Sequence, residues 1–276
     1  MVKLLFKTCL PLLLSGAFLI CGCNVDIPGL VRSTDLDDRL KERDNFTFLN
    51  RADAPPLSLG DAYSFIVVTD THIENGNTGG LDKLKAVIDS DDEIKFAVIV
   101  GDITQYGDAQ DVRKFIEIAD TLGVPCYPVI GNHDIYFANW SVWRTLIGST
   151  CYRIDGDGTT LFFMDSANAF FGRDQLDWLQ EELETAQTRI FVFSHANIFV
   201  EIPIDIQQST DAKERARIVS ILRNRGDAMF MGHVHRRIIK NVGNVQYITI
   251  EDYIGNRVYC RVSVTKTGMA YKFEKL

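Results

Sequence analysis

Short apolar runs alternate with helical stretches along most of the chain, and this alternation limits the possible folds more than any other feature. The runs YSFIVVT (63–69) and KFAVIV (95–100) have the length and composition of buried strands. Between them, residues 80–90 place apolar side chains at helical spacing. The alternation continues with helices expected at 108–122, 172–186 and 210–224 and strands expected at 126–130, 159–166, 189–195 and 227–233. It predicts an α/β domain.

The last part of the chain follows a different pattern. No further helix is expected there, and three segments alternate like antiparallel strands: 245–250, 256–264 and 269–275. The whole stretch from 61 to 276 is long enough for one domain with a substantial core. We therefore expect a single domain over 61–276.

The first residues are typical of an export signal. Lys3 and Lys7 precede an apolar run over 10–20, which is shorter than a membrane-spanning helix and contains Pro11. The segment ICGC ends at Cys23 and resembles a bacterial lipoprotein box. An uncleaved signal anchor is the alternative interpretation.

This resemblance implies a lipoprotein signal peptide over 1–22 and a lipid-carrying Cys23. The mixed polar residues that follow predict a tether, so that 23–60 would form the lipidated N-terminus and tether. The expected location is the bacterial cell envelope, with the domain outside the cytoplasm and anchored to the membrane. Asn24 follows Cys23, which favours the outer membrane by analogy with enteric bacteria.

The net charge limits the possible binding partners, and the cysteine content limits the possible disulfides. The formal net charge is −8, and removing the signal peptide would take away two lysines and no acid. Nonspecific nucleic-acid binding needs a basic face, so no nucleic-acid partner is expected. Beyond Cys23, the expected mature chain contains Cys126, Cys151 and Cys260, which allow at most one intramolecular disulfide. Buried free thiols are the simpler expectation.

Polar side chains gather where the predicted strands end. Ligands of open α/β sheets bind beyond the carboxyl ends of the strands. All five histidines of the chain fall at such ends, and none lies on a predicted helix. The candidate site residues are Asp70, His72, Asp102, Asn132, His133, Asp134, His195, His233 and His235.

Each of these residues also has an ordinary structural interpretation. A His-x-His pair is more often structural or exposed than metal-binding, and an aspartate after a strand is commonly a helix cap or a turn residue. Asn132 after a glycine and Asp165 in FMDS have the same ambiguity. The five clusters together, however, indicate a metal site, because imidazole and carboxylate suit Zn, Mn and Fe. A single carboxylate can bridge two such ions about 3.5 to 4 Å apart, an arrangement used in phosphoester hydrolysis.

The order of these motifs resembles the calcineurin-like metallophosphoesterase superfamily. The motifs are D-x-H at 70–72, G-D at 101–102, G-N-H-D at 131–134, a histidine at 195 and G-H-x-H at 232–235. This resemblance implies an α/β fold, also classed as α+β, in which two mixed β-sheets pack as a sandwich and are flanked by helices. It also implies a dinuclear metal site at the carboxyl ends of the strands.

The resemblance further implies a role for each candidate. One metal would be held by Asp70, His72 and His235. The other would be held by Asn132, His195 and His233. Asp102 would bridge the two ions, while His133 would contact the phosphate and protonate the leaving oxygen, with Asp134 orienting its ring. We expect His233 and His235 to point the same way, because they flank Val234 in an extended segment.

One difference from the superfamily pattern separates this chain from the purple acid phosphatases. Purple acid phosphatases carry a tyrosine three residues after the bridging aspartate, where this chain has Gln105. A tyrosinate-iron site is therefore not expected. The segments GDITQYGD and GNHD instead resemble bacterial cyclic-nucleotide and general phosphodiesterases.

The implied activity is that of a dinuclear metal-dependent phosphoester hydrolase that uses a metal-bridging hydroxide on a small-molecule phosphodiester or phosphomonoester. The two divalent ions would be Mn, Fe or Zn. The alternative is a noncatalytic envelope lipoprotein that keeps the metal site for binding or structure. Loops 73–80, 135–150 and 196–210 follow motif-bearing strands, so they are expected to line the substrate site. The aromatic residues of 135–143 would either stack on a substrate or, as the spacing favours, pack as an amphipathic helix.

Overall fold

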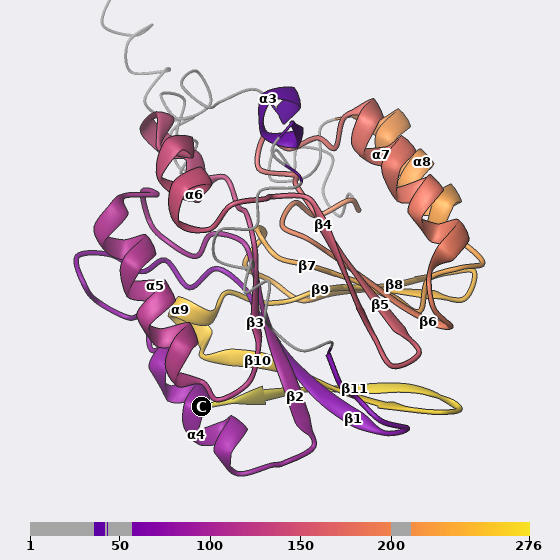
Figure 1. Cartoon of the computed structure of the whole chain (residues 1–276), viewed down its shortest axis with the longest axis horizontal. Coiled ribbons are helices and arrows are strands. Elements are labelled where there is room, and N and C mark those ends of the chain that lie inside the picture. The colour runs from indigo at the N-terminus through magenta and orange to yellow at the C-terminus, as the bar shows by residue number, and fades with distance from the viewer. Residues whose placement is uncertain (1–35, 42, 44–56, 200–210) are drawn as a thin grey trace, which may run out of the picture.

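A sandwich of two β-sheets forms the centre of the protein, and helices cover its two outer faces (Figure 1). The computed structural model describes residues 36–41, 43, 57–199 and 211–276. The predicted signal peptide and Cys23 lie outside the described residues. Within the described part of the chain, no helix has both the length and the apolar character needed to cross a bilayer.

The first sheet has five strands in the order β11-β10-β1-β2-β3. Their bounds are β1 (Tyr63–Val68), β2 (Ile94–Val100), β3 (Cys126–Val129), β10 (Val258–Thr265) and β11 (Gly268–Lys275). β1, β2 and β3 are parallel, whereas β10 runs antiparallel to β1 and pairs with β11. The first sheet is therefore mixed.

The second sheet has six strands in the order β4-β5-β6-β7-β9-β8. Their bounds are β4 (Tyr152–Gly156), β5 (Thr159–Met164), β6 (Arg189–Ser194), β7 (Ala228–Met231), β8 (Ile238–Val242) and β9 (Val245–Thr249). This sheet is mixed as well, because β5, β6, β7 and β9 are parallel and the two edge strands are antiparallel to their neighbours. The predicted fold class is confirmed.

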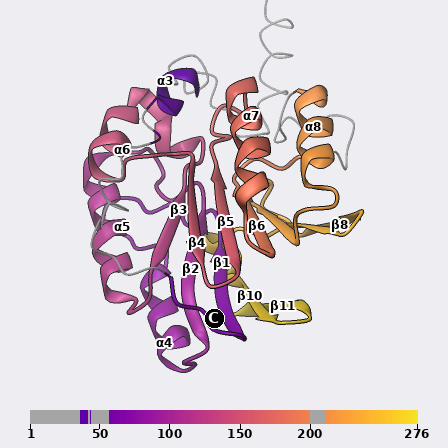
Figure 2. The same ribbon diagram turned by 45° about the vertical axis from the view of Figure 1, so that its right-hand side comes forward.

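Helices close each face of the sandwich, as Figure 2 shows. The first sheet packs against α4 (Leu84–Asp89), α5 (Ala109–Thr121) and α6 (Trp140–Leu146). The second sheet packs against α7 (Arg173–Glu182) and α8 (Ala212–Leu222). In β1, Phe65 points between the sheets and Ile66 points toward the helices. Both faces of β1 are therefore buried, which explains its unbroken apolar sequence.

Several elements differ from the sequence prediction. The strands β4 and β8 were not predicted, and a short helix, α9 (Tyr253–Asn256), follows β9. The segment 245–250 was expected to pair only antiparallel, but β9 also pairs in parallel with β7. Alternation along a strand reveals which face is buried, but the direction of the neighbouring strand depends on long-range packing.

Part of the predicted tether packs against the domain. Residues Leu36–Leu40 form α3, and its Arg39 is fully buried. The Arg39 guanidinium donates to the carboxylate of Asp165 at 2.7 Å and to Asn168 at 2.6 Å. Asp165 therefore has a structural partner, which settles the ambiguity that its sequence position left open. The domain boundary at 61 stays a prediction.

The three described cysteines, Cys126, Cys151 and Cys260, are buried thiols rather than disulfide sulfurs. Burial raises the pKa of the Cys260 thiol to about 12, so the reactive thiolate is disfavoured there. The simpler of the two expectations for these cysteines is confirmed.

Candidate metal centre

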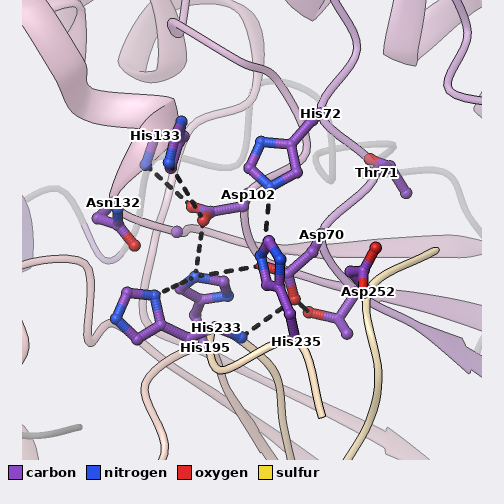
Figure 3. A network of polar contacts seen from close by, with 12 residues as sticks. Asp70, Thr71, His72, Asp102, Asn132, His133, His195, His233, His235 and Asp252 are labelled. Atoms are coloured by element: carbon purple, nitrogen blue, oxygen red, sulfur yellow. Dashed lines mark hydrogen bonds and ion pairs between the residues drawn. The ribbon is translucent and has the colours of Figure 1, made fainter. Parts of the chain in front are cut away.

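Loops that leave the carboxyl ends of strands from both sheets converge on one polar site (Figure 3). Loops after β1, β2 and β3 carry five of the predicted residues: Asp70, His72, Asp102, Asn132 and His133. Loops after β6 and β7 carry the other three histidines: His195, His233 and His235. The structure therefore brings residues that are far apart in the sequence into one cluster, at the place predicted from the strand ends.

The backbone at this cluster is strained. Nine described residues other than glycine have a positive φ. Five of the nine are predicted ligands: Asp70 (54°), His72 (43°), Asp102 (47°), His233 (72°) and His235 (51°). Residues with side chains rarely adopt this region, and such strain concentrates at functional sites. The expected extended geometry around Val234 is wrong, because left-handed bends orient its two histidine neighbours.

Asp70 fixes one carboxylate oxygen to the protein and presents the other to histidines. Its Oδ2 accepts hydrogen bonds from the Thr69 hydroxyl at 2.6 Å and from the backbone N–H of His233 at 3.0 Å. Its Oδ1 lies 3.2 Å from Nε2 of His235 and 3.9 Å from Nε2 of His72. The free oxygen therefore faces the two histidines that were predicted to share a metal with it.

The two carboxylate oxygens of Asp102 also have different partners. Its Oδ1 accepts a hydrogen bond from the backbone N–H of His133 at 2.9 Å, while its Oδ2 lies 3.1 Å from Nε2 of His195. On the other side of that ring, Nδ1 of His195 lies 2.9 Å from the carbonyl oxygen of Val100. A carbonyl only accepts, so Nδ1 carries the proton and Nε2 is the atom available as a ligand.

Burial and charge set the protonation of this cluster. Burial disfavours the charged imidazole of His195, but the charges of Asp102 and Asp70 and the contacts with Asp102 and Val100 together outweigh burial and raise the pKa of His195 to about 9. Burial, together with the charge of His195, lowers the pKa of His233 to about 4. Burial also lowers the pKa of His72, although two aspartates oppose it. His72 and His233 are therefore neutral at pH 7, which is the state in which imidazole binds a metal.

Among the site residues that the structure describes, His72 and Asn132 have buried polar atoms without a hydrogen-bond partner. Both ring nitrogens of His72 are unpartnered, as is Oδ1 of Asn132. Nδ2 of Asn132 donates to the Tyr136 hydroxyl at 2.8 Å, so its amide is held with the oxygen left over. Buried polar atoms normally have partners, and a bound cation would satisfy both of these groups.

The spacing of the candidate atoms also suits metal ions. Three groups each have ligand atoms within 4.8 Å of one another: Asp70, His72 and His235; His72, Asp102 and His133; and Asp102, His195 and His233. The first group is the set predicted for one ion. The third joins two ligands predicted for the other ion to the predicted bridge. The residues therefore fit a pair of divalent cations, although the role of each ligand stays a prediction.

The predicted contact between Asp134 and the His133 ring is wrong. Asp134 is fully buried, and its carboxylate accepts from the backbone N–H groups of Ile103, Thr104 and Gly131. Burial and the charge of Asp102 raise the pKa of Asp134 to about 6. Asp134 thus ties the loop after β3 to the loop after β2, and its donors are backbone N–H groups and the Thr104 hydroxyl rather than the neighbouring ring.

The backbone of Gln105 orients the His133 ring instead. Nδ1 of His133 lies 2.9 Å from the Gln105 carbonyl oxygen, so this nitrogen carries a proton. Nε2 of the same ring lies 3.9 Å from Oδ2 of Asp102 and faces the site. Sequence reasoning missed this contact because any residue at 105 offers the same carbonyl oxygen.

Thr69 and Tyr136 were also not predicted to support the site. Thr69 is next to Asp70 in the sequence, but nothing in the motif distinguishes a supporting hydroxyl from an ordinary strand residue. Tyr136 lies four residues after Asn132, at a spacing that suits a helical turn and gave the only available signal. Gly232 belongs to the same support, since a Cβ there would lie 1.9 Å from the Thr69 hydroxyl oxygen.

Comparisons with known proteins agree with this geometry. A curated protein of Fibrobacter succinogenes, described as a probable cyclic nucleotide phosphodiesterase, is 25% identical over 154 residues, which cover 52% of this chain and 58% of that protein. Among solved structures, a dimetal phosphatase from Danio rerio superposes with a TM-score of 0.62 at 14% identity, covering 79% of this chain and 96% of that one. A purple acid phosphatase from yellow lupin gives 0.64 at 12% identity, covering 80% and 52%.

These two structural similarities show the fold. The sequence itself matches the family model described as calcineurin-like phosphoesterase over residues 63–237, which is more than half of the chain. That match spans every strand-end motif from Asp70 to His235. The family uses a dinuclear metal centre, and this chain places candidate ligands at the corresponding edge of its sandwich. The chain therefore belongs to the calcineurin-like phosphoesterase family, whose members are metal-dependent phosphoester hydrolases.

Proposed function

We propose that this protein hydrolyses small-molecule phosphodiesters with two divalent metal ions, Mn, Fe or Zn, at the site in Figure 3. The observation that carries the proposal is the position of His133, whose Nε2 faces the same carboxylate oxygen as the ligand candidate His195. A metal site with only a structural role has no use for an adjacent proton donor. The description of the Fibrobacter relative supports a diester substrate over a monoester.

The residues of the site divide into two ligand sets and one shared carboxylate. Asp70, His72 and His235 would hold one ion. Asn132, His195 and His233 would hold the other, and Asp102 would contact both. When bound, such a pair acts as a Lewis acid and lowers the pKa of water toward about 7.

The protein residues around the metals hold the reacting groups in place. The Gln105 carbonyl keeps a proton on Nδ1 of His133, so a second proton on Nε2 is the one available to the leaving oxygen. Tyr136 keeps the amide of Asn132 in one orientation, with its oxygen free for the site. The Val100 carbonyl does the same for the ring of His195.

Replacing His133 tests its role as the acid. In His133→Ala we expect unchanged metal content and about a 10²- to 10⁴-fold loss of turnover, because one proton donor is removed. The loss should be greater for a phenyl leaving group than for a 4-nitrophenyl leaving group, which departs without help. The measurement is kcat for a matched pair of methyl aryl phosphodiesters with Mn²⁺ present. An equal loss on both substrates would contradict the acid role.

Turnover by the wild-type protein tests the broader proposal. A folded protein that contains two metal ions but hydrolyses neither diester would favour the noncatalytic envelope lipoprotein instead. Hydrolysis that depends on added Mn²⁺ supports the enzyme, and the ratio of diester to monoester rates identifies the preferred class.

We also propose that the protein is exported and anchored in the bacterial cell envelope through lipid on Cys23, with the outer membrane favoured. The support is the sequence of the first 24 residues, with its basic start, apolar run and ICGC segment. Mass spectrometry of the N-terminal peptide should show a modified Cys23 as its first residue. Release of Cys23→Ala into the soluble fraction would agree with this, whereas an unmodified, uncleaved N-terminus would refute it.

A further inference from the structure

Two exposed aromatic rings contact each other beside the candidate metal centre. Tyr106 lies in the loop between β2 and α5, and Phe137 lies in the short 3-10 segment His133–Ala138 that follows β3. Their centroids are 5.8 Å apart, with 39% of Tyr106 and 47% of Phe137 exposed. Phe137 is the most exposed large apolar side chain among the described residues. We call these two residues the aromatic pair.

A series of ring contacts connects the aromatic pair to the metal centre. The ring of Phe137 lies 6.2 Å from that of Tyr136, which lies 4.4 Å from the ring of His133. The ring of His133 in turn lies 4.6 Å from that of His72. The aromatic pair is therefore on the side of the site where His133 would protonate the leaving oxygen.

The structure holds the aromatic pair in place. The side-chain amide of Asn139 donates to the Tyr106 carbonyl at 2.7 Å, and its backbone N–H donates to the Tyr136 carbonyl. Phe137 has a φ of 56°, a conformation that bulky residues rarely adopt. The Phe137 ring remains exposed, so its burial does not stabilise the fold enough to explain the strained backbone. Backbone strain of this kind is a feature of ligand-binding sites.

The other aromatic residues of this segment have a different role. Trp140 and Trp143 are buried in the cluster between the first sheet and its helices, so the predicted packing as a helix is confirmed for them. Tyr136 and Phe137 are outside that cluster: Tyr136 contacts His133, and the left-handed backbone of Phe137 turns its ring outward to meet Tyr106.

We propose that the aromatic pair binds a planar ring of the substrate, so that the preferred substrates are phosphoesters with an aromatic ring on the leaving-group side. This inference rests on the proposed function, since it assumes that the phosphate binds at the metal centre. A substrate ring that packs against the exposed faces or edges of two aromatic side chains is favoured over a saturated group of equal size, because aromatic rings attract planar π-bearing groups.

Calorimetry on the full chain loaded with Mn²⁺ tests the inference without relying on turnover. The ligands are benzyl phosphate and cyclohexylmethyl phosphate, which have the same charge and a similar length. The wild type should bind the benzyl ester about three- to tenfold more tightly, although the cyclohexyl ester is the more hydrophobic. Phe137→Leu and Tyr106→Leu should bring the two affinities close to each other.

A matched control is available on the edge strand β11. Tyr271 and Phe273 form another ring pair with centroids 5.8 Å apart, and Tyr271→Leu makes the same chemical change there. It should leave the preference for the benzyl ester unchanged. Circular dichroism of each variant checks that the fold is intact.

A second ligand pair identifies the source of the ring. Adenosine 5′-monophosphate and ribose 5-phosphate differ by a nucleobase, whereas the first two ligands carry a ring one methylene away from the ester oxygen. A ring-dependent gain with either pair that disappears in Phe137→Leu supports the inference. A wild type that binds inorganic phosphate but gains nothing from either ring overturns it. Ring-dependent binding without any diester hydrolysis would support the aromatic pair and count against the proposed function.

Discussion

The layer between the two sheets and the metal centre at their edge share strands but differ in backbone conformation and in side-chain chemistry. Between the sheets, Phe163, Phe193 and Phe230 stack with centroids 5.1 and 5.4 Å apart, in fully buried and regular strands. At the edge, the backbone turns left-handed and buried carboxylates face histidines. The interior of the sandwich contributes stability, whereas the edge keeps strain and charge that a ligand can use. Substitutions between the sheets should therefore lower the stability of the fold, whereas substitutions at the edge should lower metal binding and turnover.

The largest expected effect is at the predicted bridge between the metals. Asp102→Ala removes the oxygen that faces His195, so metal content should fall below two ions per chain and turnover should fall by more than about a thousandfold. Elemental analysis and the rate on a methyl aryl phosphodiester measure both. Full activity in this variant would contradict the contrast between the two regions, because the metal centre would then not depend on its buried carboxylate.

A cavity in the aromatic layer should have the opposite result. Phe193→Ala should lower the free energy of unfolding by about 3 to 5 kcal/mol, because a fully buried ring between two stacked neighbours is lost. Urea unfolding of the metal-free protein measures this change. The folded fraction should still bind two metals, and loss of the metals with no loss of stability would contradict the division between the two regions.

A single methyl group tests how tightly the edge is packed. The Cβ in Gly232→Ala would lie 1.9 Å from the Thr69 hydroxyl oxygen and 2.8 Å from Oδ2 of Asp70. Moving this support should weaken metal binding by about 10- to 100-fold, as measured by Mn²⁺ titration. Gly226→Ala is the control, since its nearest neighbours would be 3.7 Å away. Equal effects of the two substitutions would show that Gly232 has no special relation to the site.

The mildest perturbation is a change of pH, which leaves every residue in place and alters only the protonation of the metal centre. The pKa of His195 is raised to about 9, so its proton stabilises the metal-free fold fully below the ordinary histidine pKa, and this stabilisation is lost as pH rises through 9. Metal binding needs the neutral ring and therefore changes in the opposite direction.

Affinity for Mn²⁺ should accordingly rise by about tenfold per pH unit for each proton displaced, between about pH 7 and about pH 9. His233 should release no proton, because its pKa of about 4 leaves it neutral throughout this range. Titration in a weakly buffered solution counts the protons released. An affinity that is independent of pH would contradict a protonated His195 in the metal-free site.

Much of the fold was predictable because local patterns report local structure. The buried strands from β1 to β7 are apolar runs, with the exception of β4, whose sequence YRIDG has a partly exposed, polar pattern. The edge strand β8 was missed for a similar reason, since three of its five residues are exposed. Edge strands have one unpaired side and need less apolar sequence, so their composition does not distinguish them from loops.

The candidate residues of the site were also predictable, whereas their supporting contacts were not. An aspartate or histidine at a strand end can be read from the sequence, because strand ends of one sheet lie together and these side chains have few other reasons to gather there. The Gln105 carbonyl, the Val100 carbonyl and the fixed oxygen of Asp70 are set by backbone position, to which the identity of the residue contributes little.

By itself, the sequence determined which side chains are present at each strand end, and with them the α/β class and the metal-binding chemistry. Only the tertiary structure decided that Asp134 ties two loops together, that His133 is oriented by a carbonyl, and that Phe137 turns outward to meet Tyr106. The physical reason is that apolar periodicity and residue chemistry are encoded locally. Backbone hydrogen bonds and left-handed bends, in contrast, depend on segments that meet only when both sheets have packed.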